Sequence, residues 1–251
     1  MLRRDLLKGW RYIGAFGPDL MLCAGTVRVG PLRQAFWAVW ERDRGRLHER
    51  TTSVPGVVAL PDGAVRVRSA GVEIDLRVEA AGVPVALTSP HGRGEIWTRK
   101  TPVRVVGTVR VDGRARAVDL RGLQDDSGGR HARVTRWCWA AGVGRDREGR
   151  AVVWNLVDGV HDAPASSERA VWVDGVAAPV GPVAFAQDLA AVRGSGVDLA
   201  FAAEATRERR ENLGVVASDY VQPFGAVSGT LPGGIDLAEG FGVMERHRAR
   251  W

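Results

Sequence analysis

The last residues of the chain alternate between two chemical types. The segment from Val243 reads VMERHRARW, so Glu245, His247 and Trp251 occupy every second position. Successive side chains of a strand point to opposite faces, and this spacing predicts a strand with an acid, an imidazole and an indole on one face. The other face would carry a row of arginines, namely Arg246, Arg248 and Arg250. The acid–histidine face fits either acid/base catalysis or a structural polar pair at the mouth of a barrel.

A second pair of carboxylates lies near the middle of the chain. The segment LQDDSGGRH places Asp125 and Asp126 next to each other, just before a glycine pair. One interpretation is a turn, because Asp, Ser and Gly all favour turns. The other is that one carboxylate faces a cavity, where burial would raise its pKa and make it a general acid. Neighbouring residues of a strand point in opposite directions, so at most one of the two would face such a cavity.

Aromatic and amide side chains interrupt the apolar segments that follow. Trp137 and Trp139, in VTRWCWAAG, share one face of a strand. They form either core packing or the wall of a lipophilic pocket, where their rings could stabilise a cation. Asn155 lies within the apolar run AVVWNLV, and Gln222 lies within YVQPFG. A buried amide without a hydrogen bond costs about 1–3 kcal/mol, so each amide either fastens a neighbouring segment or points into a cavity.

The spacing of Glu245 and His247 would allow both to bind one metal ion from a single strand. A third ligand would have to come from elsewhere, and the spacing selects none of the candidates, which are Asp125, Asp126, His131 and His161. The sequence also lacks the glycine-rich nucleotide motifs, the Gly-x-Ser-x-Gly elbow and the His-Glu-x-x-His motif. We therefore expect no metal and no cofactor, and favour an acid/base pair or a structural pair.

Composition sets bounds on the partners and the location of the protein. The 251 residues include 35 Lys and Arg against 29 Asp and Glu, a formal net charge of +6. The arginines are spread along the chain with acids between them, so we expect no binding to nucleic acid. Two cysteines cannot form a disulfide framework, the first residues lack the apolar core of a signal peptide, and no run reaches the length of a membrane span. These features predict a cytoplasmic protein without a transmembrane segment.

Apolar residues recur with a period of two along much of the chain, and no internal repeat is evident. VEIDLRVEA is the clearest half-buried strand, and Asp112-Gly113 predicts a tight hairpin turn. Helical patterns are scarce: AQDLAAVRG could form a short helix, and EATRERRENLG a loop or a single helical turn. About 18 short strands would fill this length. We predict an all-β protein of two antiparallel β-barrels packed together, with few short helices, divided into residues 1–124 and 125–251.

Several motifs occur in the same order as in a known bacterial family. They are KGWRYIGAFGPDL, WTRKTPVRVVGTVRVDG, DDSGGRHARVTRWCWAAGVG, VVWNLVDG, ERAVWVDG, VDLAFAAEATRERRENLGVVASDYVQPFGAVSGTL and GVMERHRARW. On these motifs the chain resembles the domain-of-unknown-function family 2804, although the family often has Glu-Asn where this chain has Glu168-Arg169. That family is similar in turn to two-domain lipocalin-like proteins, which include carotenoid hydratases of the hydroxyneurosporene synthase type. The resemblance implies two calycin-type β-barrels with a ligand cavity in or between them.

The resemblance and the candidate residues lead to two hypotheses for function. In the first, the protein is an enzyme that hydrates, cyclises or isomerises a lipophilic small molecule, such as a terpenoid, polyene or polyketide, without a cofactor. Asp126, Asp125 or Glu245 would donate the proton, while His247 and Asn155 would position water or a polar group of the substrate. The remaining pocket residues would be Trp137, Trp139, Gln222 and Trp251. In the second hypothesis, a lipocalin-like carrier holds the same hydrophobic ligand without changing it.

Overall fold

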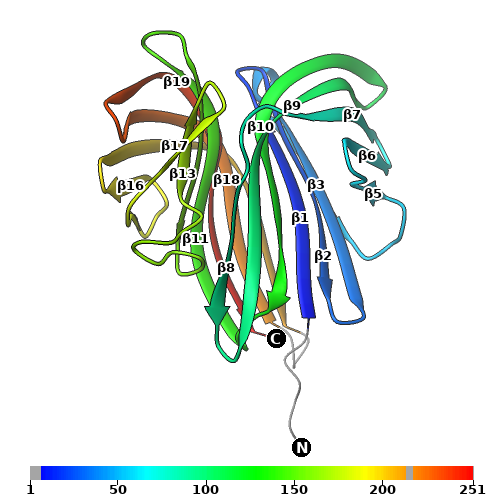
Figure 1. Cartoon of the computed structure of the whole chain (residues 1–251). Helices are drawn as coiled ribbons and strands as arrows, with labels where there is room; N and C mark the ends of the chain where they lie inside the picture. The colour runs from blue at the N-terminus through cyan, green and yellow to red at the C-terminus, as the bar shows by residue number, and fades with distance from the viewer. Residues whose placement is uncertain (1–6, 213–216, 251) are drawn as a thin grey trace, which may run out of the picture.

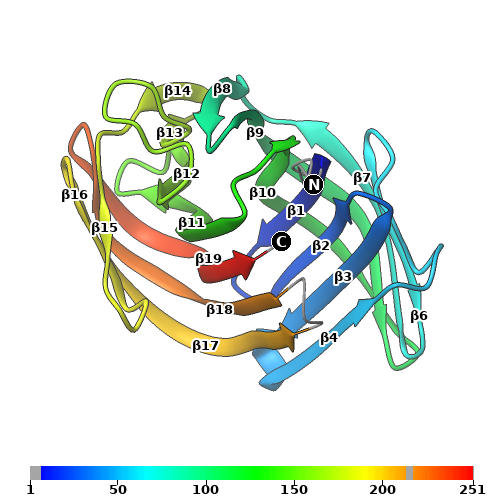
Figure 2. The same cartoon turned by 90° about the horizontal axis from the view of Figure 1, so that it is seen from below.

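The computed structural model describes residues 7–212 and 217–250, which form two antiparallel sheets with 19 strands in all (Figures 1 and 2). The helical content of these residues is one short 3-10 helix, η1 (Arg42–Arg44). The all-β fold class predicted from the sequence is therefore confirmed, and the two predicted antiparallel β-barrels correspond to these two curled sheets. Within the described part of the chain, no helix is long and apolar enough to cross a membrane.

The first sheet has ten strands and is formed by the first half of the chain. These strands are β1 (Leu7–Phe16), β2 (Leu20–Val29), β3 (Leu32–Glu41), β4 (Arg46–Thr52), β5 (Val58–Ala59), β6 (Ala64–Ser69), β7 (Val72–Ala80), β8 (Val85–His91), β9 (Gly94–Val111) and β10 (Arg114–Arg130). Their spatial order is β4-β3-β2-β1-β10-β9-β7-β6-β5, and β8 pairs with β9.

The second sheet has nine strands and is formed by the second half of the chain. These strands are β11 (Val134–Asp146), β12 (Ala151–Asp158), β13 (Ala170–Val173), β14 (Val176–Pro179), β15 (Ala184–Phe185), β16 (Ala191–Gly194), β17 (Val197–Asn212), β18 (Ala217–Leu231) and β19 (Ile235–Arg250). Their spatial order is β14-β13-β12-β11-β19-β18-β17-β16-β15.

Both sheets are built with the same strand order. In each, the first four strands form a meander, and the last strand returns to pair with the first, so that β10 pairs with β1 and β19 pairs with β11. The repetition is one of topology, since the residues themselves show no evident repeat. The change from one sheet to the other falls between Arg130 and Val134. A division into separate domains after residue 124 stays a prediction.

Two local sequence patterns form the elements that they predict. Strand β7 covers VEIDLRVEA, and its Val, Ile and Leu residues are buried while its charged residues are exposed. Asp112 and Gly113 join β9 to β10 with positive φ angles of 47° and 81°. Positive φ at both central residues is what the tight hairpin turn requires, and Asp-Gly meets it at low cost.

The two weak helical patterns are not helices, so those predictions are wrong. AQDLAAVRG contains a turn followed by β16, and EATRERRENLG lies almost entirely in β17. Val192 of β16 is fully buried in the core of the second sheet, and β17 pairs along its length with β18. These non-local contacts outweigh the small local preference of such short polar segments for helix.

Three apolar cores hold the molecule together. One lies within each curled sheet, around residues such as Ile74 in the first and Leu199 in the second. The third core lies between the sheets and takes side chains from both of them, including Met21, Trp172 and Phe224. Each sheet therefore packs on both of its faces, and the inter-sheet core adjoins the cavity described below.

Polar contacts also join the two sheets. The indole N–H of Trp172 donates to the backbone oxygen of Val83 at 2.7 Å. Glu204 sits at a bulge in β17 and accepts hydrogen bonds from Trp40 at 2.9 Å and from Arg42 at 2.6 and 2.7 Å. A bulge redirects the side chain of the extra residue, which here aims a carboxylate at the other sheet.

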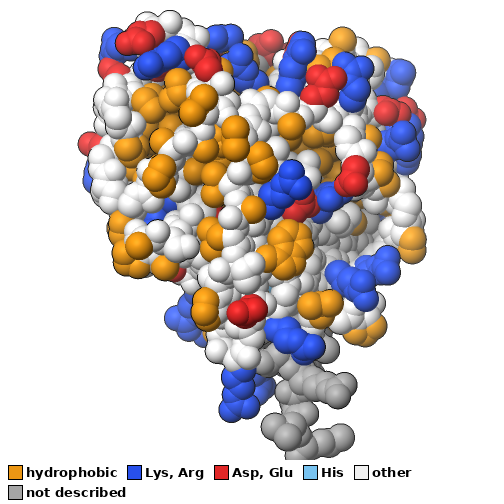
Figure 3. All heavy atoms as spheres, in the orientation of Figure 1, with side chains coloured by type: hydrophobic (Ala, Val, Ile, Leu, Met, Phe, Trp, Pro, Cys, Tyr) orange, Lys and Arg blue, Asp and Glu red, His pale blue; other side chains and the backbone are white. Residues whose placement is uncertain are grey.

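Basic and acidic side chains are interspersed on the surface. Figure 3 shows both signs side by side along the upper rim, over the hairpins of the two sheets. Exposed charges of opposite sign also pair within the first sheet, as Arg68 does with Asp75 at 2.9 Å and Arg104 with Asp119 at 2.7 Å. The mixed charge of the sequence thus becomes a mixed surface on this face.

Candidate active site between the two sheets

A cavity of about 480 Å³ is lined by residues of both sheets. Its lining includes residues near the start of β1 and near the end of β19, two strand ends that lie close together in Figure 2. The first sheet contributes residues of β1, β2, β3, β4, β9 and β10 to its lining, and the second sheet contributes residues of β11, β12, β17, β18 and β19. The volume is within the range of small-molecule sites, about 300–1,000 Å³. Both halves of the chain are needed to form this cavity.

One wall is a row of side chains that crosses the first sheet from strand to strand. The register places Asp125 of β10 between Lys100 of β9 and Tyr12 of β1. The row continues through Gly25 of β2 to Phe36 of β3. A Cβ atom on Gly25 would lie 2.2 Å from the Phe36 ring, so the glycine allows this ring to lie flat against its neighbouring strand.

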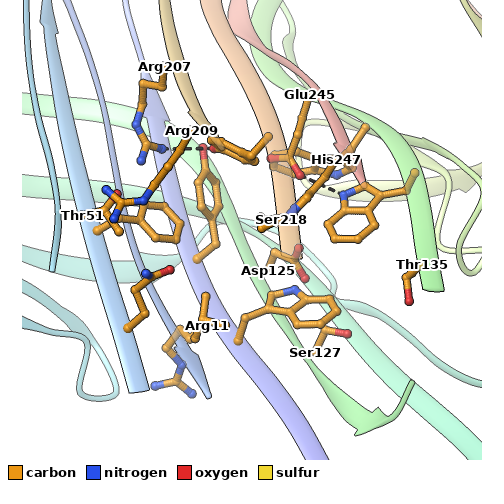
Figure 4. A pocket seen from close by; sticks show the side chains of 18 of the residues that line it. Arg11, Thr51, Asp125, Ser127, Thr135, Arg207, Arg209, Ser218, Glu245 and His247 are labelled. Carbon is orange, nitrogen blue, oxygen red and sulfur yellow. Dashed lines mark hydrogen bonds between the residues drawn. The ribbon is translucent and has the colours of Figure 1, made fainter. Parts of the chain in front are cut away.

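The opposite wall comes from the second sheet. Trp139 of β11 lies opposite Glu245 of β19, and Trp137 lies opposite His247. Figure 4 shows Asp125 on one side of the cavity and Glu245 with His247 on the other. The alternation predicted for the end of the chain is therefore present, with Glu245 and His247 facing inward and the neighbouring arginines of β19 exposed.

The two walls carry the same arrangement of residue types. The first strand of each sheet has two inward aromatic residues, which are Trp10 and Tyr12 on β1 and Trp137 and Trp139 on β11. On the last strand of each sheet a carboxylate lies opposite the second aromatic residue: Asp125 opposite Tyr12, and Glu245 opposite Trp139. The topological repeat thus extends to the residues that line the cavity.

Glu245 is a buried carboxyl group that is bonded at both oxygens. The indole N–H of Trp137 donates to one oxygen at 2.8 Å, and the amide of Gln222 donates to the other at 2.8 Å. Burial raises the pKa of Glu245 from 4.5 to about 7, against the lowering effect of these two donors. The group is therefore able to exchange a proton near neutral pH.

His247 is held in its neutral form beside Glu245. Its Nε2 atom lies 2.8 Å from the Ser218 hydroxyl, and its ring lies 4.3 Å from the Trp137 ring, measured between centroids. Burial lowers the pKa of His247 to about 4. A neutral imidazole can orient water or a polar group without adding positive charge to the cavity.

A buried charge cluster lies on the first wall. The Lys100 ammonium lies 2.6 Å from an Asp125 oxygen and 3.2 Å from a Glu168 oxygen. Burial lowers the pKa of Lys100, but the two carboxylates outweigh this effect and hold it above its usual value. Burial raises the pKa of Asp125, although the Lys100 charge opposes that shift. One lysine thus serves two carboxylates at the edge of the cavity.

A buried arginine fixes the orientation of Gln222. Arg207 is 3% exposed and donates to the Gln222 side-chain oxygen at 3.2 Å, to the Tyr220 hydroxyl at 3.1 Å and to a Glu49 oxygen at 2.9 Å. Because the Gln222 oxygen accepts from Arg207, its amide N–H points at Glu245. Arg207 therefore positions the acid through an intervening amide.

The structure brings most of the predicted site residues together. Five of them line the cavity: Asp125, Trp137, Trp139, Glu245 and His247. Asn155 and Gln222 lie behind the lining, where they hold lining residues in place. Asn155 accepts from the Trp139 indole at 2.7 Å and donates to the backbone oxygen of Glu168 at 2.8 Å. Trp251, the remaining aromatic residue predicted for the pocket, lies outside the described residues.

Asp126 lies away from the cavity, in contrast to its neighbour. Its side chain is on the opposite face of β10, where Arg11 donates to one oxygen at 2.6 Å and Gln124 donates to the other at 2.6 Å. Of the two adjacent carboxylates, Asp125 is the one that lines the cavity. The geometry of Asp126 is that of a structural ion pair and does not support a role as the cavity acid.

Several lining residues were not predicted from the sequence, namely Tyr12, Lys100, Glu168, Arg207 and Tyr220, and His161 was considered as a possible metal ligand alone. Lys100 could have been singled out, because the chain has just two lysines among its 35 basic residues. Glu168 and His161 belong to a connecting segment whose residue types give no signal of burial. Arg207 lies in a segment so rich in charge that it resembles a solvent-exposed loop.

The described residues contain no group of three or more His, Cys, Asp or Glu side chains placed to hold a metal ion. Carboxylate and imidazole groups do face the cavity, but all four of those described above are bonded to other side chains of the protein. Glu245 is bonded to an indole and an amide, Asp125 and Glu168 to Lys100, and His247 to a hydroxyl. The arrangement suits proton transfer and ligand binding by the side chains themselves.

Solved structures of other proteins share this fold. Kievitone hydratase from Nectria haematococca aligns with a TM-score of 0.57 and 11% identity, covering 95% of this chain and 88% of that chain. A Nitrosomonas europaea protein provisionally assigned as AttH aligns with a TM-score of 0.55 and 14% identity, covering 96% of this chain and 92% of that chain. CghA aligns with a TM-score of 0.52 and 12% identity, covering 98% of this chain and 88% of that chain.

No curated protein gives a significant match. The family model for the domain of unknown function DUF2804 matches residues 96–251, more than half of the chain, and the chain therefore belongs to that family.

Proposed function

We propose that the protein is an enzyme that transfers protons to and from a lipophilic small molecule bound between its two sheets, without a cofactor. Hydration, cyclisation and isomerisation of an alkene are reactions that this chemistry allows. The observation that carries the proposal is Glu245, a carboxyl group with a pKa of about 7 that faces an aromatic cavity. A terpenoid, a polyene or a polyketide is the expected class of substrate.

The proposed reaction begins and ends at Glu245. Its protonated form gives a proton to one carbon of a double bond, which leaves a cation on the ligand and a carboxylate on the protein. The N–H groups of Trp137 and Gln222 stay bonded to that carboxylate and stabilise its new charge. The cation then adds water and releases a proton, or loses a proton from a neighbouring carbon. In either case the released proton restores Glu245.

The rest of the cavity supports the charged intermediate. The rings of Tyr12 and Trp139 meet edge to face with centroids 5.4 Å apart, and both line the cavity. Aromatic faces attract a cation, by about 0.5–2 kcal/mol for each favourable contact. His247 is neutral, so it can accept a hydrogen bond from the attacking water without repelling the cation.

The fold comparison agrees with the coarser part of this proposal. Kievitone hydratase, whose name describes the addition of water to a small molecule, has the same fold. At 11% identity the likeness is one of architecture, and fold alone does not determine function. The assignment of chemistry to this chain therefore depends on Glu245 and its neighbours.

The proposal is tested by the loss of proton transfer in Glu245→Gln. The purified protein is incubated in heavy water with an extract of hydrophobic metabolites, and the products are analysed by mass spectrometry. We expect wild type to add one water or to introduce deuterium into a specific compound. Glu245→Gln should reduce this rate by about 100-fold or more, the usual contribution of a general acid. Glu239→Gln, an exposed change on the same strand, is the matched control.

The same experiment separates catalysis from transport. A hydrophobic compound that is retained by wild type and recovered unchanged would identify a carrier, the second function that the cavity allows. Product formation by Glu245→Gln at the wild-type rate would show that another group supplies the proton.

A further inference from the structure

Two neighbouring residues of the cavity lining each carry a buried polar atom without a hydrogen-bond partner in the described part of the chain. They are the second carboxylate oxygen of Glu168, Oε2, and the Nε2 atom of His161. The two side chains are 3% and 6% exposed, and both line the cavity. Buried polar atoms in folded proteins are nearly always bonded, so this pair indicates bonding groups that the described residues do not themselves supply.

The other polar atoms of these two side chains are already in use. Lys100 lies 3.2 Å from Oε1 of Glu168, and the Ser89 hydroxyl lies 2.8 Å from Nδ1 of His161. These contacts fix both side chains and leave Oε2 and Nε2 directed elsewhere. Burial lowers the pKa of His161 to about 4, so its ring is neutral at pH 7 and carries one N–H.

The backbone holds the two residues next to each other. The Glu168 N–H donates to the His161 oxygen at 3.0 Å, which closes the connecting segment between β12 and β13. Arg169, itself 2% exposed, donates to backbone oxygens of Asp162 at 3.0 Å and Ala163 at 3.1 Å within that segment. His161 has a φ of 52°, a conformation that is unusual for a residue with a side chain. The pair is therefore positioned by a rigid connection.

The chemistry of the two atoms limits the ligand groups that could bond to both of them. A carboxylate oxygen accepts a hydrogen bond, and an imidazole N–H donates one. When Nδ1 of His161 accepts from the Ser89 hydroxyl, the N–H of the ring is on Nε2, and a ligand hydroxyl can then give its hydrogen to Glu168 while its oxygen accepts from His161. A ketone or an ether has no hydrogen to give to Glu168. A carboxylate would be repelled by Glu168 and by Asp125, which share the single Lys100 charge.

We propose that Glu168 and His161 form a hydroxyl-binding subsite, so that the ligand of this cavity is a lipophilic alcohol or phenol. The inference rests on the proposed function because it places the ligand in the same cavity. It adds the chemical group by which the ligand is recognised, and it sets one end of the molecule against Glu168 and His161.

The subsite is tested with two probes that differ in one group. Binding of 2-naphthol and of its methyl ether, 2-methoxynaphthalene, is measured by equilibrium dialysis. The ether is the more apolar molecule, so partition into an apolar cavity favours the ether, and preference for naphthol reports the hydroxyl. We expect wild type to bind naphthol at least about tenfold more tightly, as a hydrogen bond to a charged group provides. The anion 2-naphthoate should bind more weakly than naphthol.

Two variants and one control assign the preference to these residues. In Glu168→Gln, Lys100 attracts the amide oxygen, which leaves the NH₂ group at the Oε2 position as a donor. The naphthol preference should then fall below about threefold. His161→Asn tolerates the same backbone conformation but lacks Nε2, and the preference should fall again. Thr230→Val removes an exposed hydroxyl of β18, outside the cavity lining, and should keep the full preference.

Each outcome decides between the proposals. Equal binding of the two probes by wild type, or an unchanged preference in Glu168→Gln, overturns the hydroxyl subsite and leaves the proton-transfer proposal standing. Glu245→Gln should retain the naphthol preference even when it loses turnover. If none of the three probes binds up to its solubility limit, the cavity does not take molecules of this size, and the subsite and the proposed function both fail.

Discussion

Two opposing effects set the pKa of Glu245. Removal from water favours the neutral acid and raises the pKa, while the hydrogen bonds from Trp137 and Gln222 favour the carboxylate and lower it. The balance places the pKa near 7, so either form is accessible at neutral pH. A group that serves as both donor and acceptor of a proton needs this balance.

The raised pKa of Glu245 makes the free energy of unfolding depend on pH. The pKa rises from 4.5 in the unfolded chain to about 7 in the folded one. Stability linked to this group is therefore complete below pH 4.5 and is lost as the pH rises through about 7. Between about pH 5.5 and about pH 8, we expect wild type to lose about 2 kcal/mol relative to Glu245→Gln.

Urea denaturation of both proteins at the two pH values measures this difference. Taking the difference between variant and wild type removes the contribution of the buried histidines, which is common to both. A constant difference across the pH range would mean that Glu245 titrates at its ordinary value.

The two adjacent carboxylates should respond differently to the same substitution. Asp125→Asn removes a partner of Lys100 on the cavity wall, and we expect turnover to fall by about tenfold or more. Asp126→Asn acts on the opposite face, where Arg11 still pairs with Asp62 at 2.8 Å, and turnover should change by less than about twofold. The comparison is made by the deuterium-incorporation assay. Equal losses would contradict the placement of the two side chains.

Alternation within a strand predicted a large part of this site. It placed Glu245 with His247, and Trp137 with Trp139, because those pairs lie on single strands. It could not choose between Asp125 and Asp126, since the choice depends on which of them lies opposite Tyr12. The partners of Asp125 and Glu245 come from distant strands and loops, whose register a single sequence does not reveal.

At the scale of the elements, glycine lets neighbouring strands approach. On β9, a Cβ atom at Gly107 would lie 2.2 Å from the backbone oxygen of Asp75, and the φ of Gly107 is 156°. At the hairpin, Gly113 also has a positive φ, but a Cβ atom there would have no other atom within 4 Å. The two glycines therefore meet different demands, one steric and one conformational.

Alanine substitutions should separate these demands. Gly113→Ala introduces conformational strain alone and should cost about 1 kcal/mol of unfolding free energy. Gly107→Ala adds a collision with the backbone of β7 and should cost about 3 kcal/mol or more. Urea unfolding of the two variants beside wild type measures both values. Equal costs would mean that the strands can separate at Gly107 without penalty.

The long alternating strands were easier to predict than the two short segments with a weak helical pattern. Long alternating segments and Asp-Gly turns specify β7 and the β9–β10 hairpin directly. AQDLAAVRG failed as a helix because the fate of such a short segment is decided by its pairing with β17. EATRERRENLG failed because it carries polar residues on both faces of a strand, including the buried Arg207, which gives no apolar period to detect.

At the scale of the whole molecule, the core between the sheets couples the two halves. Met21 is fully buried in this core, and Ile74 is fully buried in the core of the first sheet. Contacts such as that between Trp172 and Val83 add polar links across the same boundary. A molecule joined in this way should unfold as one unit.

We therefore expect a single unfolding transition. Tryptophan fluorescence and far-UV circular dichroism should follow the same unfolding curve. Met21→Ala should shift that curve by lowering the free energy of unfolding by about 2–5 kcal/mol. Ile74→Ala, which lies in the first sheet, should shift that same single curve. Two separate transitions, with Ile74→Ala moving one of them, would instead support independent domains divided after residue 124.

The overall architecture was predictable because turn residues and alternation are local signals. The strand count and the two-sheet arrangement follow from chain length and from the scarcity of helical patterns. The location of the cavity did not follow, since it depends on how two separately formed sheets pack against each other. The resemblance to lipocalin-like proteins allowed a cavity either within or between the barrels, and the structure has it between the sheets.

The matching walls of the cavity also bear on how such a chain could arise. Tandem duplication of a gene for one sheet would produce the repeated strand order, with one carboxylate from each copy. The equivalent neighbours of these carboxylates differ, for Lys100 lies beside Asp125 and Gln222 lies beside Glu245. That single divergence, from an ammonium to an amide, distinguishes a fixed ion pair from a proton carrier. Gln222→Lys would place an ammonium group beside Glu245, and its charge should lower the pKa of that acid below about 7.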